Sequence, residues 1–314
     1  MKALAVDLGG SHATCALVED RKIVRAHTLA AEGSRGLASA LPLLADELRA
    51  VMNEAGCRTP ECAGLAFCFC GLVNHANAKV ISTNAKYDDA PSLDLKAWCE
   101  KSLGVPFKIE NDARMALLGE RYAGAAQGFD DVVMVTLGTG IGGAAMIQGR
   151  PLRGQHAQAG CLGGHFPVLF TGRRCTCGAI GCAEAEASGW SLPNVCRNTR
   201  GFDSSLLANE GSITFERLFR CAGAGDRVAI EVRDRCLAVW GALAVGLIHA
   251  YDPEVVVLGG GVMQSGFEIL PFLQDYVNRH AWTPWGKVSL RSAGLGNQAA
   301  LLGAIPLLQG HTET

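Results

Sequence analysis

The sequence predicts an α/β protein built from two similar halves. Short apolar runs that end in glycine alternate with segments whose large apolar residues recur every three or four positions, the pattern of strands alternating with helices. The run 2–18 is also echoed by the run 132–147, since each has an apolar stretch, a glycine turn and a second apolar stretch. The echo indicates two halves that each open with a hairpin, with both turns facing a shared cleft.

Four apolar runs are predicted as buried strands because each is short and ends in a tight glycine-rich turn. They are 3–6, 64–67, 132–135 and 255–258. A further strand-like stretch covers 105–109. Helices are predicted over 36–56, from a one-sided leucine stripe, over 113–126, with Gly128 as its stop, and over 226–251, ended by Asp252-Pro253.

The 314 residues suffice for two domains, and we place the boundary near Asp112. The first domain is then 1–112 and the second 113–297, while a C-terminal helix over about 298–314 could pack back on the first. From 152 onward the chain is irregular and rich in Gly, Cys and Arg. We interpret 152–190 as an insertion in the second domain.

Composition excludes several classes of protein. The net charge of -2 argues against a nucleic-acid binder held by a basic face, and no apolar run approaches the length of about 20 residues that spans a bilayer. The N-terminus lacks the layout of a secretory signal. With no export signal, the 13 cysteines indicate a reducing cytoplasm, where clustered thiols are metal candidates.

Two glycine loops are candidates for phosphate binding. In 7–11, Asp7 stands at a strand end beside Gly9 and Gly10, whose backbone N–H groups could approach phosphate oxygens, and Ser11 adds a hydroxyl. Asp7 could hold Mg²⁺ through water. The loop 137–143 offers a second row of N–H donors and fits neither a P-loop nor a dinucleotide fingerprint. A tight hairpin without ligand is the alternative for the first loop.

Glu110-Asn111-Asp112 follows a predicted strand and precedes a predicted helix. An aspartate at this place could simply cap the helix. It could instead act as the general base that accepts the proton of a substrate hydroxyl, with Asn111 hydrogen-bonding a neighbouring hydroxyl. The residues alone leave both readings open.

One imidazole and three thiols lie within 18 residues, at His165, Cys175, Cys177 and Cys182. This is the ligand set of a closed structural zinc site, and Gly178 and Gly181 would supply the turns that wrap a metal. Free structural thiols are the alternative. A metal-dependent hydrolase is excluded on chemical grounds, because a site of three Cys and one His leaves no open position for water.

The order of these motifs resembles the ROK family of sugar kinases, and the match covers essentially the whole chain. The matching segments are Asp7–Ser11, Glu110–Ala113, Leu137–Gly143, His165 with Cys175–Glu184, Gly259–Val262 and Leu295-Gly296 with Gly303-Ala304. The resemblance implies an actin-like, hexokinase-like (ribonuclease H-like) fold of two domains with an active-site cleft between them. It also implies an ATP-dependent enzyme that phosphorylates a sugar hydroxyl, usually the 6-OH.

The resemblance carries roles onto individual residues. Asp112 would be the catalytic base, and the sugar would be contacted by Gly71, Asn84, Asn111, Asp112, His165 and Glu184. ATP and its phosphates would be bound by Asp7, Gly9, Gly10, Ser11, His12, Gly138, Thr139, Gly140, Gly259, Gly260 and Gly261. A structural zinc would position His165 and Glu184, and magnesium would accompany ATP. The family also implies a cytoplasmic homo-oligomer, a dimer or tetramer, whose two domains close over sugar and Mg-ATP.

The chain departs from the family pattern in the sugar-binding region. The family usually reads Ala-Gly-Glu-x-Gly-His, whereas 159–165 inserts one residue and places Cys161 and Leu162 where the glutamate is expected. Cys70 replaces a usual proline, and Ser11-His12 replaces Thr-Lys. N-acetylated hexosamines, fructose and allose are therefore alternative substrates to glucose, and a non-catalytic sugar sensor is an alternative function. A repressor is not expected, because the first loop begins at Asp7 and leaves no preceding DNA-binding segment.

Overall fold

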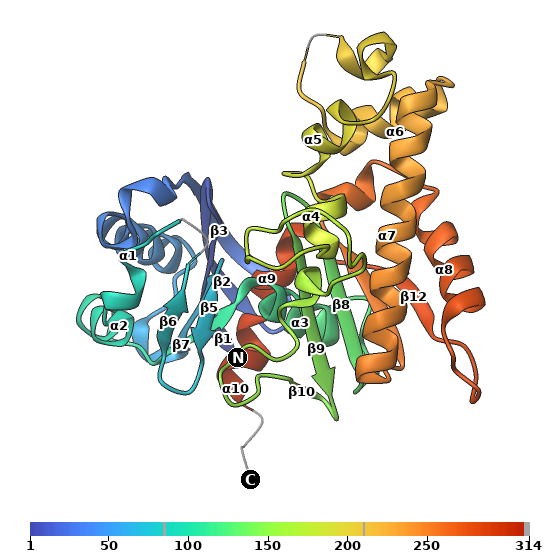
Figure 1. The fold of residues 1–314 in the computed structure, drawn as a ribbon. Helices are drawn as coiled ribbons and strands as arrows, with labels where there is room; N and C mark the ends of the chain where they lie inside the picture. Colours follow the sequence, from blue (N-terminus) through green and yellow to red (C-terminus); the bar gives the residue numbers. More distant parts are fainter. Residues whose placement is uncertain (84–85, 210, 311–314) are drawn as a thin grey trace. The chain divides into compact units, whose positions relative to one another are not determined.

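The computed structural model describes residues 1–83, 86–209 and 211–310 and separates into two compact units (Figure 1). The first unit consists of 1–128, 150–159 and the chain from 294 onward, and the second of 129–149 and 160–293. Residues 113–128 and 150–159 thus group with the first unit, although the domain boundary predicted at Asp112 would assign them to the second. Within the described part of the chain, no helix has both the length and the apolar character needed to cross a membrane.

The first unit is built on a five-stranded sheet in the order β3-β2-β1-β4-β7. Its strands are β1 (Lys2–Leu8), β2 (His12–Glu19), β3 (Lys22–Ala30), β4 (Cys62–Phe69) and β7 (Phe107–Asn111). The strands β1, β2 and β3 pair antiparallel, whereas β4 lies parallel to both β1 and β7. A small hairpin of β5 (Leu72–Asn74) and β6 (Lys79–Ser82) follows β4. The hairpin predicted over 2–18 is confirmed.

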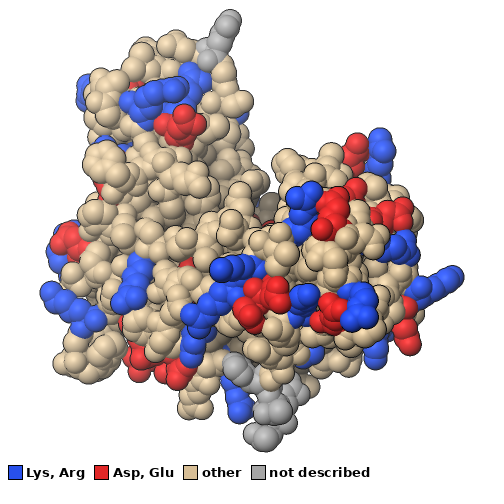
Figure 2. Space-filling view, turned by 180° about the vertical axis from the view of Figure 1, so that it is seen from behind, with Lys and Arg blue, Asp and Glu red and all other residues tan. Residues whose placement is uncertain are grey.

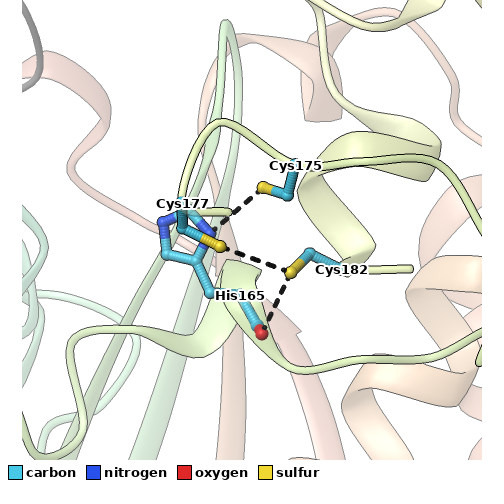
Figure 3. Close-up of side chains that lie close together, drawn as sticks. All are labelled: His165, Cys175, Cys177 and Cys182. Atoms are coloured by element: carbon cyan, nitrogen blue, oxygen red, sulfur yellow. Dashed lines mark hydrogen bonds between the residues drawn. The ribbon is translucent and has the colours of Figure 1, made fainter. Parts of the chain in front are cut away.

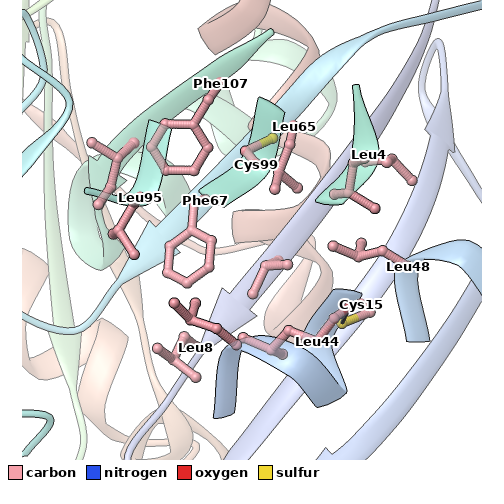
Figure 4. Close-up of a cluster of buried hydrophobic side chains, with 14 of the residues drawn as sticks. Leu4, Leu8, Cys15, Leu44, Leu48, Leu65, Phe67, Leu95, Cys99 and Phe107 are labelled. Carbon is pink, nitrogen blue, oxygen red and sulfur yellow. Dashed lines mark hydrogen bonds between the residues drawn. The ribbon is translucent and has the colours of Figure 1, made fainter. Parts of the chain in front are cut away.

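The helix predicted over 36–56 is α1 (Leu37–Glu54), and its leucine stripe is buried. The stripe packs into a core with Leu4, Phe67 and Phe107 from the sheet and Leu95 from α2 (Leu95–Leu103) (Figure 4). The first two free N–H groups of α1 are capped from a distance, because Leu37 N and Ala38 N donate to the carboxylate of Asp89.

The helix α3 (Asp112–Ala123) begins directly after β7 and ends three residues before the predicted Ala126. Its early end has a physical cause: the buried carboxylate of Glu120 accepts the N–H of Ala125 at 2.7 Å, which draws the chain out of the helix. Glu120 also accepts the N–H groups of Gly294 and Leu295. It thereby ties α3 to the C-terminal helices α9 (Ala299–Leu302) and α10 (Ala304–Gln309), which pack on the first unit as the sequence suggested.

The second unit repeats the strand pattern of the first. Its five-stranded sheet runs β10-β9-β8-β11-β12, with strands β8 (Val132–Leu137), β9 (Ile141–Ile147), β10 (Arg150–Pro151), β11 (Val255–Gly259) and β12 (Ser289–Ser292). The hairpin of β8 and β9 is antiparallel, and β11 lies parallel to both β8 and β12, as β4 does to β1 and β7. The internal echo predicted from sequence is therefore confirmed at the level of topology.

The helices of the second unit are α4 (Ala183–Ala187), α5 (Leu192–Arg197), α6 (Phe215–Gly223), α7 (Arg227–Tyr251) and α8 (Ile269–His280). The long α7 confirms the prediction over 226–251, since Asp226 caps its start by accepting the N–H of Ala229. It ends where Asp252 takes the left-handed conformation just before Pro253. Short 3₁₀ turns connect the remaining segments, including η4 (Gly163–His165), η5 (Phe202–Ser204), η6 (Leu206–Ala208) and η7 (Gly261–Gln264).

Charged side chains of both signs are interspersed on the surface. Figure 2 shows Lys and Arg next to Asp and Glu over the face that it presents. This mixture agrees with the near-zero balance of 28 basic and 30 acidic residues.

Candidate active site

The start of α3 brings together three residues that the sequence singled out. Asn111 is the N-cap, and its Oδ1 accepts the N–H groups of Ala113 and Arg114. Its Nδ2 donates to Gly71 O at 3.1 Å and to Asp112 Oδ1 at 2.8 Å. Asn111 therefore performs the capping that we considered for Asp112, and it orients the Asp112 carboxylate.

The Asp112 side chain is accessible to solvent, yet its protein surroundings disfavour the ionised form. Desolvation raises the pKa of Asp112 to about 6, and the negative charge of Asp7 adds to this effect. The N–H of Ala113 and the amide of Asn111 act in the opposite direction. A carboxylate with a pKa near neutrality is suited to accept and return protons.

A buried ion network lies directly beneath this carboxylate. Glu110 and Arg114 are both fully buried, and Arg114 Nη1 lies 3.4 Å from Glu110 Oε1. Arg153 donates to the other oxygen of Glu110 at 2.8 Å. The guanidinium of Arg114 also donates to the backbone carbonyls of Leu152, Ala157 and Ala159. The network thus holds the segment 150–159 against the helix that carries Asp112.

The first glycine loop joins β1 to β2 and forms a tight turn, in which Gly9 N donates to His12 O at 2.9 Å. Ser11 Oγ lies 2.8 Å from His12 Nδ1. The imidazole of His12, which stands where the family usually has a lysine, therefore orients the hydroxyl that is expected to bind a phosphate. Burial raises the pKa of Asp7 at the end of β1, and a hydrogen bond from the Cys68 thiol opposes the rise. Asp7 thus stands next to the turn, whereas the N–H of Gly9 is engaged within the turn.

In the second unit, two glycine clusters lie side by side at the ends of neighbouring strands. The turn Gly138–Gly140 follows β8, and Gly259–Gly261 follows the adjacent β11. Gly260 has φ +90°, and a methyl group there would lie 2.2 Å from Leu137 O, so only glycine lets the two strand ends approach so closely. The clusters expected to bind phosphates and nucleoside therefore form one edge of one sheet.

Glu184 and His165 are placed beside the same turn. Glu184 Oε2 accepts the N–H of Ile141 at 2.9 Å, immediately after the turn. The segment η4, which ends in His165, is pressed against β9, because a methyl group on Gly164 would lie 1.9 Å from Ile141 O. The second unit thus gathers two of the six predicted sugar contacts with the glycine clusters Gly138–Gly140 and Gly259–Gly261.

The four predicted zinc ligands converge on one point (Figure 3). All their ligand atoms lie within 4.8 Å of one another, with Cys177 Sγ 3.7 Å from Cys182 Sγ and Cys175 Sγ 3.5 Å from His165 Nδ1. Tetrahedral Zn²⁺ with Zn–S bonds of about 2.3 Å and a Zn–N bond of about 2.0 Å separates two sulfurs by about 3.8 Å and sulfur from nitrogen by about 3.5 Å. The donor set and its spacing therefore fit zinc.

The chain around these ligands is held by a buried carboxylate and two glycine turns. Fully buried Glu186 accepts the N–H of Arg173 and pairs with the guanidinium groups of Arg173 and Arg235. Gly178 and Gly181 both adopt positive φ, as the predicted turns require. The N–H of Ala179 lowers the pKa of Cys177, whereas burial raises the pKa of Cys182 to about 12. Metal binding would displace the protons of such thiols.

The comparison with known sequences decides the family. The ROK family pattern matches residues 3–311. The chain belongs to the ROK family.

Individual relatives align with this chain over nearly its full length. A glucokinase of Thermotoga maritima is 30% identical over 98% of this chain and 98% of its own. Among solved structures, a ROK hexokinase from Thermus thermophilus has a TM-score of 0.81 and 31% identity, covering 97% of this chain and 96% of that one. A ROK glucokinase from Streptomyces griseus, solved with glucose and AMPPNP, has a TM-score of 0.78 and 28% identity over 97% and 98%. The chain shares their actin-like, hexokinase-like fold.

One predicted site residue of this ROK protein is not described by the structure, and two residues near the site were not predicted from the sequence. Asn84 lies outside the described residues. Cys161, at the position of the family's glutamate, is buried and offers a thiol in place of a carboxylate. Sequence reasoning missed Arg114, because an arginine within a helical pattern ordinarily faces water. It also missed Lys86, which lies beside the first glycine loop and is separated from it by more than 70 residues.

Proposed function

We propose that this ROK protein is an ATP-dependent sugar kinase that transfers the γ-phosphoryl group of ATP to the 6-OH of a hexose. The proposal rests on the solvent-accessible carboxylate of Asp112. Asn111 orients this carboxylate, and desolvation raises its pKa to about 6. Membership of the ROK family supports it, as do full-length relatives named glucokinase and hexokinase.

Asp112 acts as the general base in this proposal. Asn111 Nδ2 and Ala113 N both donate to Asp112 Oδ1, which fixes the carboxylate and directs Oδ2 toward the sugar hydroxyl. As the hydroxyl oxygen attacks the phosphorus, its proton passes to Asp112 and ADP leaves. Desolvation makes the carboxylate basic enough to accept the proton while it remains ionised at neutral pH.

The glycine loops hold the phosphates. The N–H groups of Gly9–Ser11 in the first unit and Gly138–Gly140 in the second are the donors, and Gly259–Gly261 borders the nucleoside. Mg²⁺, which accompanies ATP, neutralises charge on the phosphate oxygens, and Asp7 is the carboxylate that would hold it through water. Asn111, His165 and Glu184 contact the sugar, with Gly71 and Asn84 lining its pocket.

The choice of sugar rests on Cys161 and Leu162. A carboxylate at this place would grip sugar hydroxyls, and a charged hydrogen bond of that kind contributes about 1.5–3 kcal/mol. A buried thiol makes no such charged hydrogen bond, so the family's usual grip on glucose is not carried over to this chain. N-acetylated hexosamines, fructose and allose are the runner-up substrates, and a sugar sensor without turnover is the alternative function that the same change favours.

We further propose that His165, Cys175, Cys177 and Cys182 hold a structural Zn²⁺. The metal would fix the chain between η4 and α4 and thereby place His165 and Glu184 on the sugar side of the second unit. A cytoplasmic homo-oligomer, dimer or tetramer, completes the proposal.

The test is ADP release with Mg-ATP against glucose, mannose, fructose, allose, N-acetylglucosamine and N-acetylmannosamine. One clear responder, with the phosphate located on C6 by phosphorus–proton coupling in NMR, is the expected result. Phosphate on another carbon would refute the 6-OH assignment. Sugar binding without ADP release from zinc-loaded, folded protein would refute the kinase in favour of the sensor.

A matched pair of variants tests the base. Asp112→Asn should lower kcat by at least about 1,000-fold while sugar affinity stays within about threefold, because the amide keeps the shape but accepts no proton. Asp46→Asn changes an exposed carboxylate on α1 and should leave kcat unchanged. Near-normal turnover of Asp112→Asn would show that another group is the base.

A further inference from the structure

The segment 86–89 is held by contacts to the first glycine loop, to Gly33 and to the start of α1. Tyr87 is fully buried, and its hydroxyl donates to Gly9 O at 2.8 Å. Tyr87 N donates to Gly33 O at 2.7 Å, and Asp89 caps the start of α1. These contacts fix the backbone of the preceding residue, Lys86, beside the turn between β1 and β2.

The Lys86 side chain runs across two glycines and ends on the loop. A methyl group on Gly33 would lie 3.0 Å from Lys86 Cβ, and one on Gly10 would lie 2.4 Å from Lys86 Nζ and 2.6 Å from Cε. Because neither Gly33 nor Gly10 has a side chain, the Lys86 side chain can occupy the space beside both. The turn itself contains no lysine or arginine, since it reads Gly9-Gly10-Ser11-His12. Lys86 thus brings an ammonium group to a loop that itself contains no lysine or arginine.

The charge of Lys86 acts on the same thiol as those of Asp7 and Asp112. Burial, together with the charges of Asp112 and Asp7, raises the pKa of Cys70 to about 11, and the positive charge of Lys86 opposes the rise. The charges of all three groups therefore act on the same thiol, which places Lys86, Asp112 and Asp7 in one part of the first unit. The ammonium therefore lies at the loop to which the proposed function assigns the phosphates.

We propose that Lys86 Nζ binds the γ-phosphoryl group during its transfer, an assignment that rests on the proposed kinase function. The phosphoryl group leaves the bridging oxygen of ATP for the sugar oxygen, the hydroxyl proton goes to Asp112, and Lys86 keeps its own proton throughout. An ammonium ion stabilises the charge on the equatorial oxygens of the transferring group as a point charge. A Cβ at Gly10 would collide with the lysine side chain as it lies in this structure, and one at Gly33 would crowd it.

The test compares Lys86→Met with Lys86→Arg and with Lys96→Met, which alters an exposed lysine on α2. Lys86→Met should lower kcat/KM for ATP by about 100-fold, while sugar affinity and melting temperature stay unchanged. Lys86→Arg should recover part of the loss, because a guanidinium also binds phosphate, and Lys96→Met should behave as the parent. Parent-like kcat/KM in Lys86→Met overturns the assignment. Equal losses of sugar affinity and stability also overturn it, since they indicate a structural role.

The pH–rate profile separates phosphoryl binding from an effect on the base. If Lys86 acted only by tuning Asp112, Lys86→Met would shift the acidic limb to higher pH and restore kcat at alkaline pH. That outcome overturns the assignment. Phosphoryl binding predicts a loss of kcat/KM at every pH with the limb in place.

Equilibrium binding keeps the inference testable even if the enzyme turns over no sugar in the panel. The dissociation constants of Mg-AMPPNP and Mg-ADP are measured by titration. Because ADP lacks the γ-phosphate, the difference between the two affinities reports how tightly the protein binds that group. Lys86→Met should weaken AMPPNP about 10-fold more than ADP. This result in a protein without turnover would refute the kinase and uphold the γ-phosphate site. Equal weakening of both nucleotides, or no AMPPNP binding by the parent, overturns the Lys86 assignment.

Discussion

Replacing Arg114 by Met should destabilise the first unit strongly. The side chain is fully buried, bonds to Glu110 and donates to three backbone carbonyls of the segment 150–159. Removing one member of a buried ion pair costs about 3–5 kcal/mol, because the partner charge loses its compensation. Glu110 keeps Arg153, which moderates the loss, whereas the three carbonyls lose a charged donor. We expect the free energy of unfolding to fall by about 4 kcal/mol.

The assay is urea unfolding followed by circular dichroism, with hydrogen exchange on peptides of 107–123 and 150–159 to localise the effect. Arg153→Met is the matched control, since this side chain is 27% exposed and water can partly replace it at Glu110. The control should lose about 2 kcal/mol. Combining Glu110→Gln with Arg114→Met removes the buried charge together with its partner, so the double variant should lose less than the sum of the two single variants.

Two results would refute this reasoning. A loss below about 1 kcal/mol in Arg114→Met would mean that the network does not hold the segment. Additive losses in the double variant would mean that uncompensated charge on Glu110 is not the cause.

Three further predictions concern the metal and the base. Cys177→Ser removes one thiolate, so the purified protein should lose its zinc by plasma mass spectrometry and melt at a lower temperature; retention of one zinc per chain contradicts the site. The rate of phosphorylation should rise with pH as Asp112 ionises around its pKa of about 6, because only the carboxylate accepts the hydroxyl proton, and a pH–rate profile that is flat between about 5 and 8 contradicts the base. Gly181→Ala would place a methyl group 1.5 Å from Leu169 O at φ +72°, so it should weaken zinc retention and stability more than Gly178→Ala, where φ is +92° but the space is open, and thermal melts with and without chelator compare the two.

Much of the fold could be predicted because local pattern and tertiary structure agree. The apolar runs before glycine clusters became β1, β8 and β11, and the long helix begins after the cap Asp226 and ends before Pro253, as its signals indicate. The strand predicted over 105–109 is displaced to 107–111 as β7. The displacement has a simple cause, because Pro106 has no N–H with which to join a ladder.

The site was predictable where its residues are adjacent in sequence and hidden where they are not. Three cysteines within eight residues predicted the cluster of metal-binding side chains, and Asn111-Asp112 predicted the start of α3. Arg114 and Lys86 gave no such signal. The backbone carbonyls that Arg114 binds lie about 40 positions away, and Gly10 lies 76 positions from Lys86. Only the folded chain shows that Arg114 is buried and that Lys86 reaches Gly10.

The return of the C-terminus to the first unit determines the order in which the chain can finish folding during synthesis. Gly119 lies so close to Ala299 that a methyl group on it would stand 1.9 Å from Ala299 O, and Lys108 Nζ donates to the carbonyls of Leu307 and Leu308. The first unit therefore lacks part of its own packing until residues 294–310 leave the ribosome, whereas the second unit is complete at 293. The half translated first is completed last, so a chain cut off at residue 293 would carry a finished second unit attached to an unfinished first one.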